Sequence, residues 1–300
     1  MKVVVTLPPY ADFLERVVMH PLVCGVRVNT VMPYRHSPQE MLRRYQGLDV
    51  PVWVDLKGRQ LRVKGAAVPP FTCVQLSHPI SVPTPCLASF GSGRECHRVM
   101  AVEGDRIFLE DGPRRLVGPG ESVNILHPQL RVHGYLTDQD KQFLEAMSNL
   151  GWRRVMLSFV EKPSDLAEVR ELLPQAEIVA KLESAAGLDA LNWLSEVPMV
   201  ARGDLLVELG CPVATLDACQ RVIRRRPEAW VGSRILNGLV GRGIELSEVM
   251  DVALLGQLGY TTLLLGDELC LREDSILEAL DWLEQLRGLQ VQPDRPLTTV

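Results

Sequence analysis

Short apolar segments alternate with amphipathic segments along most of the chain, and their order indicates an α/β protein. Apolar runs of strand length occur at 2–7, 25–30, 51–56, 155–159, 178–180, 198–201, 230–236 and 261–265. Segments with apolar residues at helical spacing follow nearly all of them, at 11–19, 37–46, 137–150, 164–173, 185–196, 214–226, 246–258 and 274–286. Runs this short suit strands buried on both faces of a parallel sheet. Eight strands followed by helices predict a complete (β/α)8 TIM barrel.

The alternation stops between residues 63 and 130. Prolines and glycines are dense there, and short β-type runs recur at 73–76, 99–102, 106–110 and 122–125. We therefore expect a small all-β domain inserted after the third strand, forming a lid over the barrel mouth. The predicted parts are the first part of the barrel at 1–62, the inserted β domain at 63–130, the second part of the barrel at 131–289 and a flexible tail at 290–300.

Charged side chains come directly after two neighbouring strands. Lys181 and Glu183 follow the strand at 178–180, and Arg202, Gly203 and Asp204 follow the strand at 198–201. α/β barrels keep their active sites at these strand ends. Charged residues also follow strands because loops contact water, but two acids, a lysine and an arginine on adjacent strands favour a functional site. The carboxylates of Glu183 and Asp204 are hard oxygen donors that could share one divalent cation.

Composition narrows the class of protein. The 300 residues carry a net charge of −5 and are 46% apolar, which suits a globular core. The mild acidity argues against nucleic-acid binding, and the absence of an apolar run of about 20 residues argues against a membrane span. Seven scattered cysteines without a C-x-x-C pair suggest reduced thiols in a cytoplasmic protein.

One group of residues offers a minority alternative. Three cysteines and two histidines fall within the predicted insert, namely Cys73, His78, Cys86, Cys96 and His97. Cysteine and histidine are zinc ligands, although this spacing matches no common zinc knuckle. A zinc site in the insert therefore stays open as a second hypothesis.

With these segments identified, the chain resembles pyruvate kinase along nearly the whole barrel. Residues 55–62 (DLKGRQLR), 180–183 (AKLE) and 199–205 (MVARGDL) are similar to that family's DTKGPEIR, AKIE and MVARGDLG segments, in the same order. Residues 27–29 (RVN) and 263–268 (LLLGDE) resemble its RxN and MLSGET segments. The predicted insert also lies where the family has its own inserted domain.

The resemblance implies roles for the residues at the strand ends. Glu183 and Asp204 match the carboxylates that hold the catalytic Mg²⁺ or Mn²⁺, and Lys181 matches the lysine that stabilises the phosphoryl group during transfer. Fixed positive charge suits the negative charge that develops in that reaction. Ser233 stands where the family has a threonine near the methyl carbon of the substrate.

The remaining implied residues contact substrate. The backbone N–H groups of Ala201, Arg202 and Gly203 correspond to those that bind the substrate carboxylate, and Arg27 and Arg62 match phosphate-facing arginines. Asn29 and Asp55 match two further site residues, which in the family also hold potassium. Val31 and Leu56 replace hydroxyl residues of the potassium site, so we expect little dependence on K⁺.

The implied activity is phosphoryl transfer between phosphoenolpyruvate and ADP, giving pyruvate and ATP. A second hypothesis is a metal-dependent lyase, transferase or hydrolase that handles a pyruvate-like 2-oxo acid through an enolate without a nucleotide. A third is a non-catalytic metabolite sensor, although a sensor has no need of Lys181. A small-molecule substrate is common to all three hypotheses, and the resemblance allows for a homo-oligomer.

Overall fold

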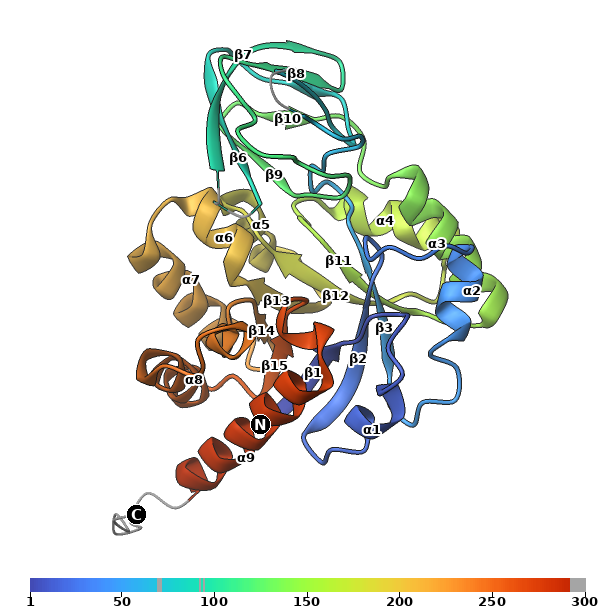
Figure 1. The fold of residues 1–300 in the computed structure, drawn as a ribbon, viewed down its shortest axis with the longest axis vertical. Coiled ribbons are helices and arrows are strands. Elements are labelled where there is room, and N and C mark those ends of the chain that lie inside the picture. Colours follow the sequence, from blue (N-terminus) through green and yellow to red (C-terminus); the bar gives the residue numbers. More distant parts are fainter. Residues whose placement is uncertain (69–71, 92, 94, 292–300) are drawn as a thin grey trace.

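The computed structural model describes residues 1–68, 72–91, 93 and 95–291 (Figure 1). Most of the predicted tail at 290–300 lies outside these described residues. Within them no helix is long and apolar enough to cross a membrane.

Eight parallel strands close into a barrel, which confirms the predicted fold. Their order around the barrel is β1-β15-β14-β13-β12-β11-β3-β2. The strands are β1 (Lys2–Thr6), β2 (Val23–Asn29), β3 (Val52–Leu56), β11 (Arg154–Leu157), β12 (Glu177–Leu182), β13 (Val197–Ala201), β14 (Trp230–Gly232) and β15 (Thr262–Leu265). Side chains such as Met156, Val179 and Met199 pack together as one buried cluster of strand residues. The barrel interior is therefore a core, and a ligand site has to lie at its mouth.

Helices surround the barrel (Figure 1). They are α1 (Leu14–Val18), α2 (Pro38–Arg43), α3 (Asp138–Leu150), α4 (Pro163–Leu172), α5 (Ala185–Asp189), α6 (Arg202–Leu209), α7 (Pro212–Arg225), α8 (Leu246–Leu258) and α9 (Glu273–Val291), with the 3₁₀ turns η1 (Ala190–Asn192), η2 (Asn237–Val240) and η3 (Leu269–Leu271). Ser37 and Thr137 cap α2 and α3, each in a capping box.

The predicted helices need two corrections. The segment at 185–196 is a short helix followed by the 3₁₀ turn η1, instead of one helix. Arg202–Leu209, which none of the predicted helices covers, is helix α6. It starts straight after β13, and Ala201 at its N-cap has no polar side chain that could have indicated a helix start.

The segment between β3 and α3 forms an antiparallel sheet with its own core. Its strands are β4 (Cys73–Gln75), β5 (Ile80–Ser81), β6 (Cys86–Phe90), β7 (Glu95–Glu103), β8 (Arg106–Leu109), β9 (Val123–Leu126) and β10 (Arg131–Val132). Five of them pair in the order β4-β8-β7-β6-β9, and β10 pairs with β5. Residues such as Leu76, Phe90 and Ile107 form a buried cluster separate from the barrel core. This insert stands at one end of the barrel, above α5 and α6 (Figure 1).

One helix exposes apolar side chains on its outer face. Leu246, Met250 and Leu254 lie four residues apart on α8, and Leu246 is 74% exposed. Residues at this spacing share one face of a helix, so they form a continuous apolar stripe on the outside of the barrel.

Candidate active site

A cavity of about 750 Å³ lies at the end of the barrel where the strands finish and the insert begins. The cavity is lined by residues at the strand ends and by two residues at the base of the insert, Gly91 and Ser122. Nine of the residues predicted from the sequence line it: Arg27, Asn29, Arg62, Lys181, Glu183, Ala201, Gly203, Asp204 and Ser233. Asp55 is fully buried beside them. The fold therefore collects residues from positions 27 to 233 at one mouth.

Asp55 is surrounded by cations. Arg27 Nε donates to its Oδ2 at 2.8 Å, Lys57 Nζ donates to the same oxygen at 2.8 Å, and Lys181 Nζ lies 3.0 Å from Oδ1. Burial raises the pKa of Asp55, but Arg27, Lys181 and Lys57 together hold that pKa well below its ordinary value. Asp55 is therefore a permanent anion that fixes three positive groups at the cavity.

Lys57 titrates differently from the other cations. Burial lowers its pKa to about 7, and the positive charges of Lys181, Arg62 and Arg27 add to that effect while Asp55 opposes it. The pKa of Lys181 is raised, because Asp55 and Glu183 outweigh the opposite effect of burial. Lys181 is therefore the ammonium that stays charged, and Lys57 is close to losing its proton at neutral pH.

Glu183 lies next to Lys181 at the end of β12. Its Oε1 is 3.4 Å from Lys181 Nζ, and its Oε2 accepts a hydrogen bond of 2.7 Å from the backbone N–H of Phe159. Phe159 adopts the left-handed region with φ +51°, a strained conformation for a bulky residue. Burial raises the pKa of Glu183 to about 7, with Asp204 raising it further and Lys181 opposing. Two carboxylates thus share one buried environment.

The donor set fits a divalent cation that also binds substrate. Asp204 Oδ2 accepts a hydrogen bond from Gln60, while its Oδ1 is buried without a hydrogen-bond partner among the described residues. In the described part of the chain, no three His, Cys, Asp or Glu side chains converge on one point. Mg²⁺ is commonly held by one or two carboxylates and completes its shell with water and substrate oxygens. Glu183 and Asp204 are therefore the residues that would hold Mg²⁺ or Mn²⁺.

Helix α6 directs its N-terminus at the cavity. Ala201, Arg202 and Gly203 form its first turn, where backbone N–H groups have no partner within the helix. A Cβ added at Gly203 would lie 3.3 Å from the Cβ of Ser233, so glycine allows a close approach. Ser233 has φ +71°, again in the left-handed region. Such an N-terminus suits a carboxylate ligand.

The side chain of Arg202 is used for structure. Its Nη1 donates to Asp251 on α8 at 2.7 Å, and its Nη2 donates to the carbonyl oxygen of Ser233 at 3.0 Å. The guanidinium thus points away from the cavity and holds Ser233 in its strained conformation. Only the backbone of Arg202 is placed for the predicted substrate contact.

The sequence reasoning assigned no role to two residues that belong to the site. Asp267, after β15, accepts hydrogen bonds from Arg27 at 3.1 Å and from Asn29 at 2.8 Å. Lys57 donates to Asp55, as described above. The rule that identified Lys181, a charged residue directly after a strand, also applies to Asp267 and would have found it.

The zinc hypothesis finds no supporting geometry among the described residues. His97 lies between the carboxylates of Glu95 and Asp111, at 2.6 Å and 3.2 Å, and His78 contacts Ser77 and the backbone of Tyr135. Both rings are thus taken up by hydrogen bonds, and no group of three metal-ligating side chains is found in the part of the chain that the structure describes.

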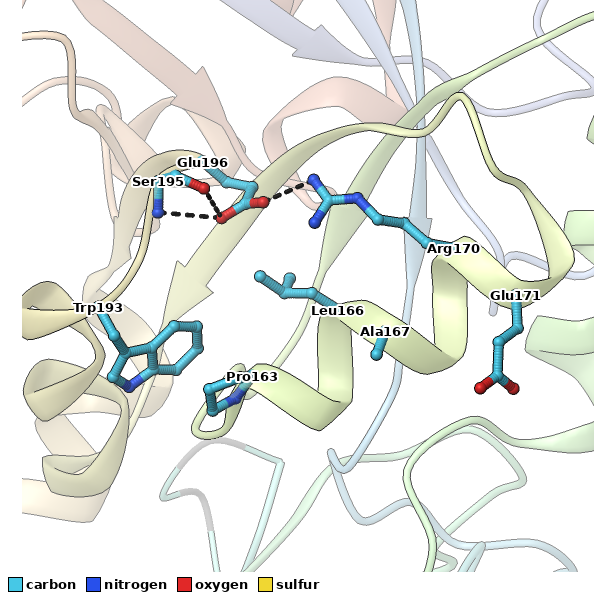
Figure 2. Close-up of a pocket in the computed structure, with 8 residues that line it drawn as sticks. All are labelled: Pro163, Leu166, Ala167, Arg170, Glu171, Trp193, Ser195 and Glu196. Carbon is cyan, nitrogen blue, oxygen red and sulfur yellow. Dashed lines mark hydrogen bonds and ion pairs between the residues drawn. The ribbon is translucent and has the colours of Figure 1, made fainter.

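A second hollow lies on the outside of the barrel, beside α4 (Figure 2). It measures about 530 Å³ and includes Leu166, Trp193 and the ion pair between Arg170 and Glu196 at 2.6 Å. Ser195 also donates to Glu196, so the polar groups of this hollow satisfy one another. The chemistry of the molecule is concentrated at the barrel mouth instead.

Comparison with known proteins finds similarity to pyruvate kinases. The family described as "Pyruvate kinase, barrel domain" matches residues 98–231. The pyruvate kinase of Haemophilus influenzae is 30% identical over 176 residues, which are 54% of this chain and 36% of that protein. A pyruvate kinase of Agrobacterium vitis is 28% identical over 215 residues, 62% of this chain and 44% of that protein. The matched part of the chain therefore spans less than half the length of each of these two relatives.

A solved structure shows the same fold. The crystal structure of pyruvate kinase from Pyrobaculum aerophilum superimposes with a TM-score of 0.72 and covers 95% of this chain and 72% of its own, at 22% sequence identity. At that identity the likeness concerns the fold. Fold and site together define an α/β barrel with a β insert beside a cation-rich cavity that holds two adjacent carboxylates. The chain is similar in sequence to the barrel domain of pyruvate kinases.

Proposed function

We propose that this protein is a divalent-metal-dependent phosphotransferase that moves a phosphoryl group between phosphoenolpyruvate and ADP. The observation that carries the proposal is the position of Lys181. Its charged ammonium is held by Asp55 at 3.0 Å and Glu183 at 3.4 Å, in a cavity that Asp204 also lines. A fixed ammonium beside two metal-type carboxylates is what transfer of an anionic phosphoryl group requires.

Different residues of the cavity would bind the carboxylate and the phosphoryl group of the substrate. The first turn of α6 offers backbone N–H groups to a carboxylate, and Ser233 lies beside that turn. Lys181 and Arg27, both anchored by Asp55, offer positive charge to a phosphoryl group. A divalent cation held by Glu183 and Asp204 would supply further neutralisation of phosphoryl oxygens. In this arrangement carboxylate and phosphoryl group are bound by different walls of the cavity.

The anchoring of these cations matters for catalysis. Because Arg27 and Lys181 are already held by Asp55, their charges need no reorganisation when substrate binds. Preorganised charge of this kind stabilises a transition state more effectively than mobile side chains do. The geometry therefore supports a catalyst, whereas a sensor would gain nothing from a charged lysine that is 5% exposed.

The expected partners are small molecules. Tyr10, Met32 and Pro33 also line the cavity, and we expect ADP and ATP to bind against these side chains. A homo-oligomer stays a prediction, and the stripe of Leu246, Met250 and Leu254 on α8 is the surface that would favour it.

Phosphorus NMR tests the proposal directly. Protein incubated with Mg²⁺, phosphoenolpyruvate and ADP should convert the phosphoenolpyruvate signal into the γ-phosphate signal of ATP, and EDTA should stop the conversion. Without ADP the phosphoenolpyruvate should persist. Release of inorganic phosphate without ADP would instead support a hydrolase. No change in either mixture would end the phosphotransferase proposal.

A further inference from the structure

The side-chain amide of Gln60 connects the base of the insert to the carboxylate of Asp204. Its Nε2 donates to Asp204 Oδ2 at 3.0 Å, and its Oε1 accepts from Arg62 Nε at 3.1 Å and from Arg62 Nη2. Gln60 is 4% exposed, so water competes little for these bonds. One amide thus joins the carboxylate of Asp204 to the guanidinium of Arg62.

Arg62 continues this connection into the insert. Its Nη1 donates to the carbonyl oxygen of Gly120 at 2.5 Å, and Arg62 also forms a β-bridge with Ser122. The chain enters the insert through Gln60 and Arg62, and Gly120 and Ser122 lie within the insert directly before β9. These two bridged stretches at the base of the insert, residues 59–64 and 118–123, are the crossing segments. One guanidinium ties them together, and Gln60 ties them to α6 of the barrel.

The amide has a chemical advantage in this position. If Arg62 paired directly with Asp204, it would occupy the carboxylate and reduce its attraction for a cation. Gln60 takes one oxygen by a neutral hydrogen bond and leaves Asp204 Oδ1 buried without a hydrogen-bond partner among the described residues. The connection thus orients Asp204 and keeps its charge available.

We propose that Gln60 is a positioning residue that couples the placement of the insert to cation binding by Asp204. The inference rests on the proposed function, because it assumes that Asp204 holds a divalent cation. When the crossing segments are in place, Gln60 fixes Asp204 with one oxygen open to the cation. By linkage, a cation bound at Asp204 makes the crossing segments harder to open.

The test uses Mn²⁺ alone and the full chain, without substrates. Mn²⁺ affinity is measured by electron paramagnetic resonance of the free ion, and hydrogen exchange is followed in peptides covering 59–64 and 118–123. In the wild type, Mn²⁺ should slow exchange in both peptides. Gln60→Met has a similar size without the hydrogen bonds, and it should weaken Mn²⁺ binding about 10- to 100-fold, as expected for groups that orient a metal ligand. Saturating Mn²⁺ should then leave exchange in both peptides unchanged.

A matched control lies within the insert. Gln75 donates its amide to Asp105 at 2.9 Å, the same kind of bond at a distance from the cavity. Gln75→Met should retain wild-type Mn²⁺ affinity and the protection of both peptides. Gln60→Met could lower the melting temperature more than Gln75→Met does. In that case Gln60→Asn is used as the test variant, because asparagine keeps the amide but is too short to reach both partners.

Two results would overturn the inference: wild-type Mn²⁺ affinity in the Gln60 variant, or Mn²⁺-induced protection of the crossing segments that survives the substitution. A wild type that binds no Mn²⁺, or that shows no protection, would overturn it as well. A wild type that binds no Mn²⁺ would count against both proposals, and the other outcomes are separable from the phosphotransferase proposal. Protein that makes ATP while Gln60→Met behaves as wild type loses only the coupling. Protein that shows the coupling but makes no ATP loses only the phosphotransferase assignment.

Discussion

Lys181 Nζ lies 3.0 Å from Asp55 Oδ1, although the two residues are 126 positions apart in the sequence. The parallel barrel brings their strands together at the mouth, and both side chains are almost completely buried. Asp55 thereby keeps an ammonium charged in a place where burial alone would favour the neutral amine. This pairing makes Lys181 available as fixed positive charge.

Lys181→Met should abolish phosphoryl transfer and leave the fold intact, since Asp55 keeps Arg27 and Lys57 as partners. Loss of a group that acts on developing charge should lower kcat by about 10²–10³-fold or more, with a smaller effect on KM. Coupled assay of pyruvate formation measures this loss. Proton NMR in deuterated water should still show metal-dependent exchange of pyruvate methyl protons, because Glu183 and Asp204 remain.

The control for this substitution is Lys141→Met, an exposed lysine on α3, which should behave as the wild type. If the wild type exchanges methyl protons but makes no ATP, and Lys181→Met also loses exchange, then the lyase hypothesis is favoured. If Lys181→Met retains full ATP formation, the role proposed for the lysine is wrong.

Activity should depend little on potassium. Asp55, one of the residues that matches the family's potassium ligands, is already bound by Arg27, Lys57 and Lys181. A further cation at Asp55 would meet the positive charges of Arg27 and Lys181, with Lys57 as a third partner of the carboxylate. Initial rates in 100 mM NaCl and 100 mM KCl should therefore agree within about twofold, a difference of only ~0.4 kcal/mol in barrier height. A rise of tenfold or more in potassium would contradict this expectation.

The barrel could be predicted from the sequence because its signal is local. Runs such as 178–180 and 198–201 are short, apolar and followed by charged residues, so strand ends and candidate site residues were found together. Parallel topology then placed Lys181, Glu183 and Asp204 at one cavity without further information.

The rest depended on contacts that leave no local pattern. Helix α6 begins without a polar cap, and β5, β6 and β10 of the insert were missed because they are short or lack regular alternation. The bond from Gln60 to Asp204 spans 144 positions, and that from Arg27 to Asp267 spans 240. Such side-chain pairs are visible only once the fold is known.

Mn²⁺ binding should strengthen as pH rises from about 6 to 8. Burial and the neighbouring Asp204 raise the pKa of Glu183 to about 7, so this carboxyl holds a proton below neutral pH and must release it to bind metal. Calorimetry in two buffers of different ionisation enthalpy should detect release of up to about one proton at pH 6. Glu183→Gln should bind Mn²⁺ weakly, with little change across this range. Wild-type affinity that is flat between pH 6 and 8 would contradict the prediction.

The insert should act as a lid over the cavity. Its residues Gly91 and Ser122 line the cavity mouth, and its strand β9 contacts α6. Replacing Lys64–Pro128 with a short linker should leave a folded barrel, because the two parts have separate cores. That barrel should still bind Mn²⁺, although more weakly because the contacts of Arg62 with Gly120 and Ser122 are lost, and with Mn²⁺ saturating it should turn over at least about tenfold more slowly, since water would reach the transferring group. Circular dichroism checks the fold, and full activity in the deletion would contradict the lid.

Glu208→Gln should stabilise the protein at pH 8 more than at pH 5. Glu208 on α6 accepts a hydrogen bond from Asn124 of the insert at 2.9 Å, and glutamine keeps that acceptor. Burial raises the pKa of Glu208 from 4.5 to about 7, and Asp204, Glu161 and Glu183 add to the effect. Between these two pKa values the folded state holds a proton that the unfolded chain releases, so the wild type loses stability as pH rises from about 4.5 to about 7.

The variant has no such loss, and its advantage in free energy of unfolding should be about 1–2 kcal/mol larger at pH 8 than at pH 5. Urea unfolding of metal-free protein at the two pH values measures this difference. The control is Glu145→Gln on the exposed side of α3, whose difference in free energy of unfolding from the wild type should be the same at pH 5 and pH 8. An advantage of Glu208→Gln that is equal at both pH values, or that shrinks as pH rises, would show that the ionised carboxylate is accommodated between α6 and the insert without cost.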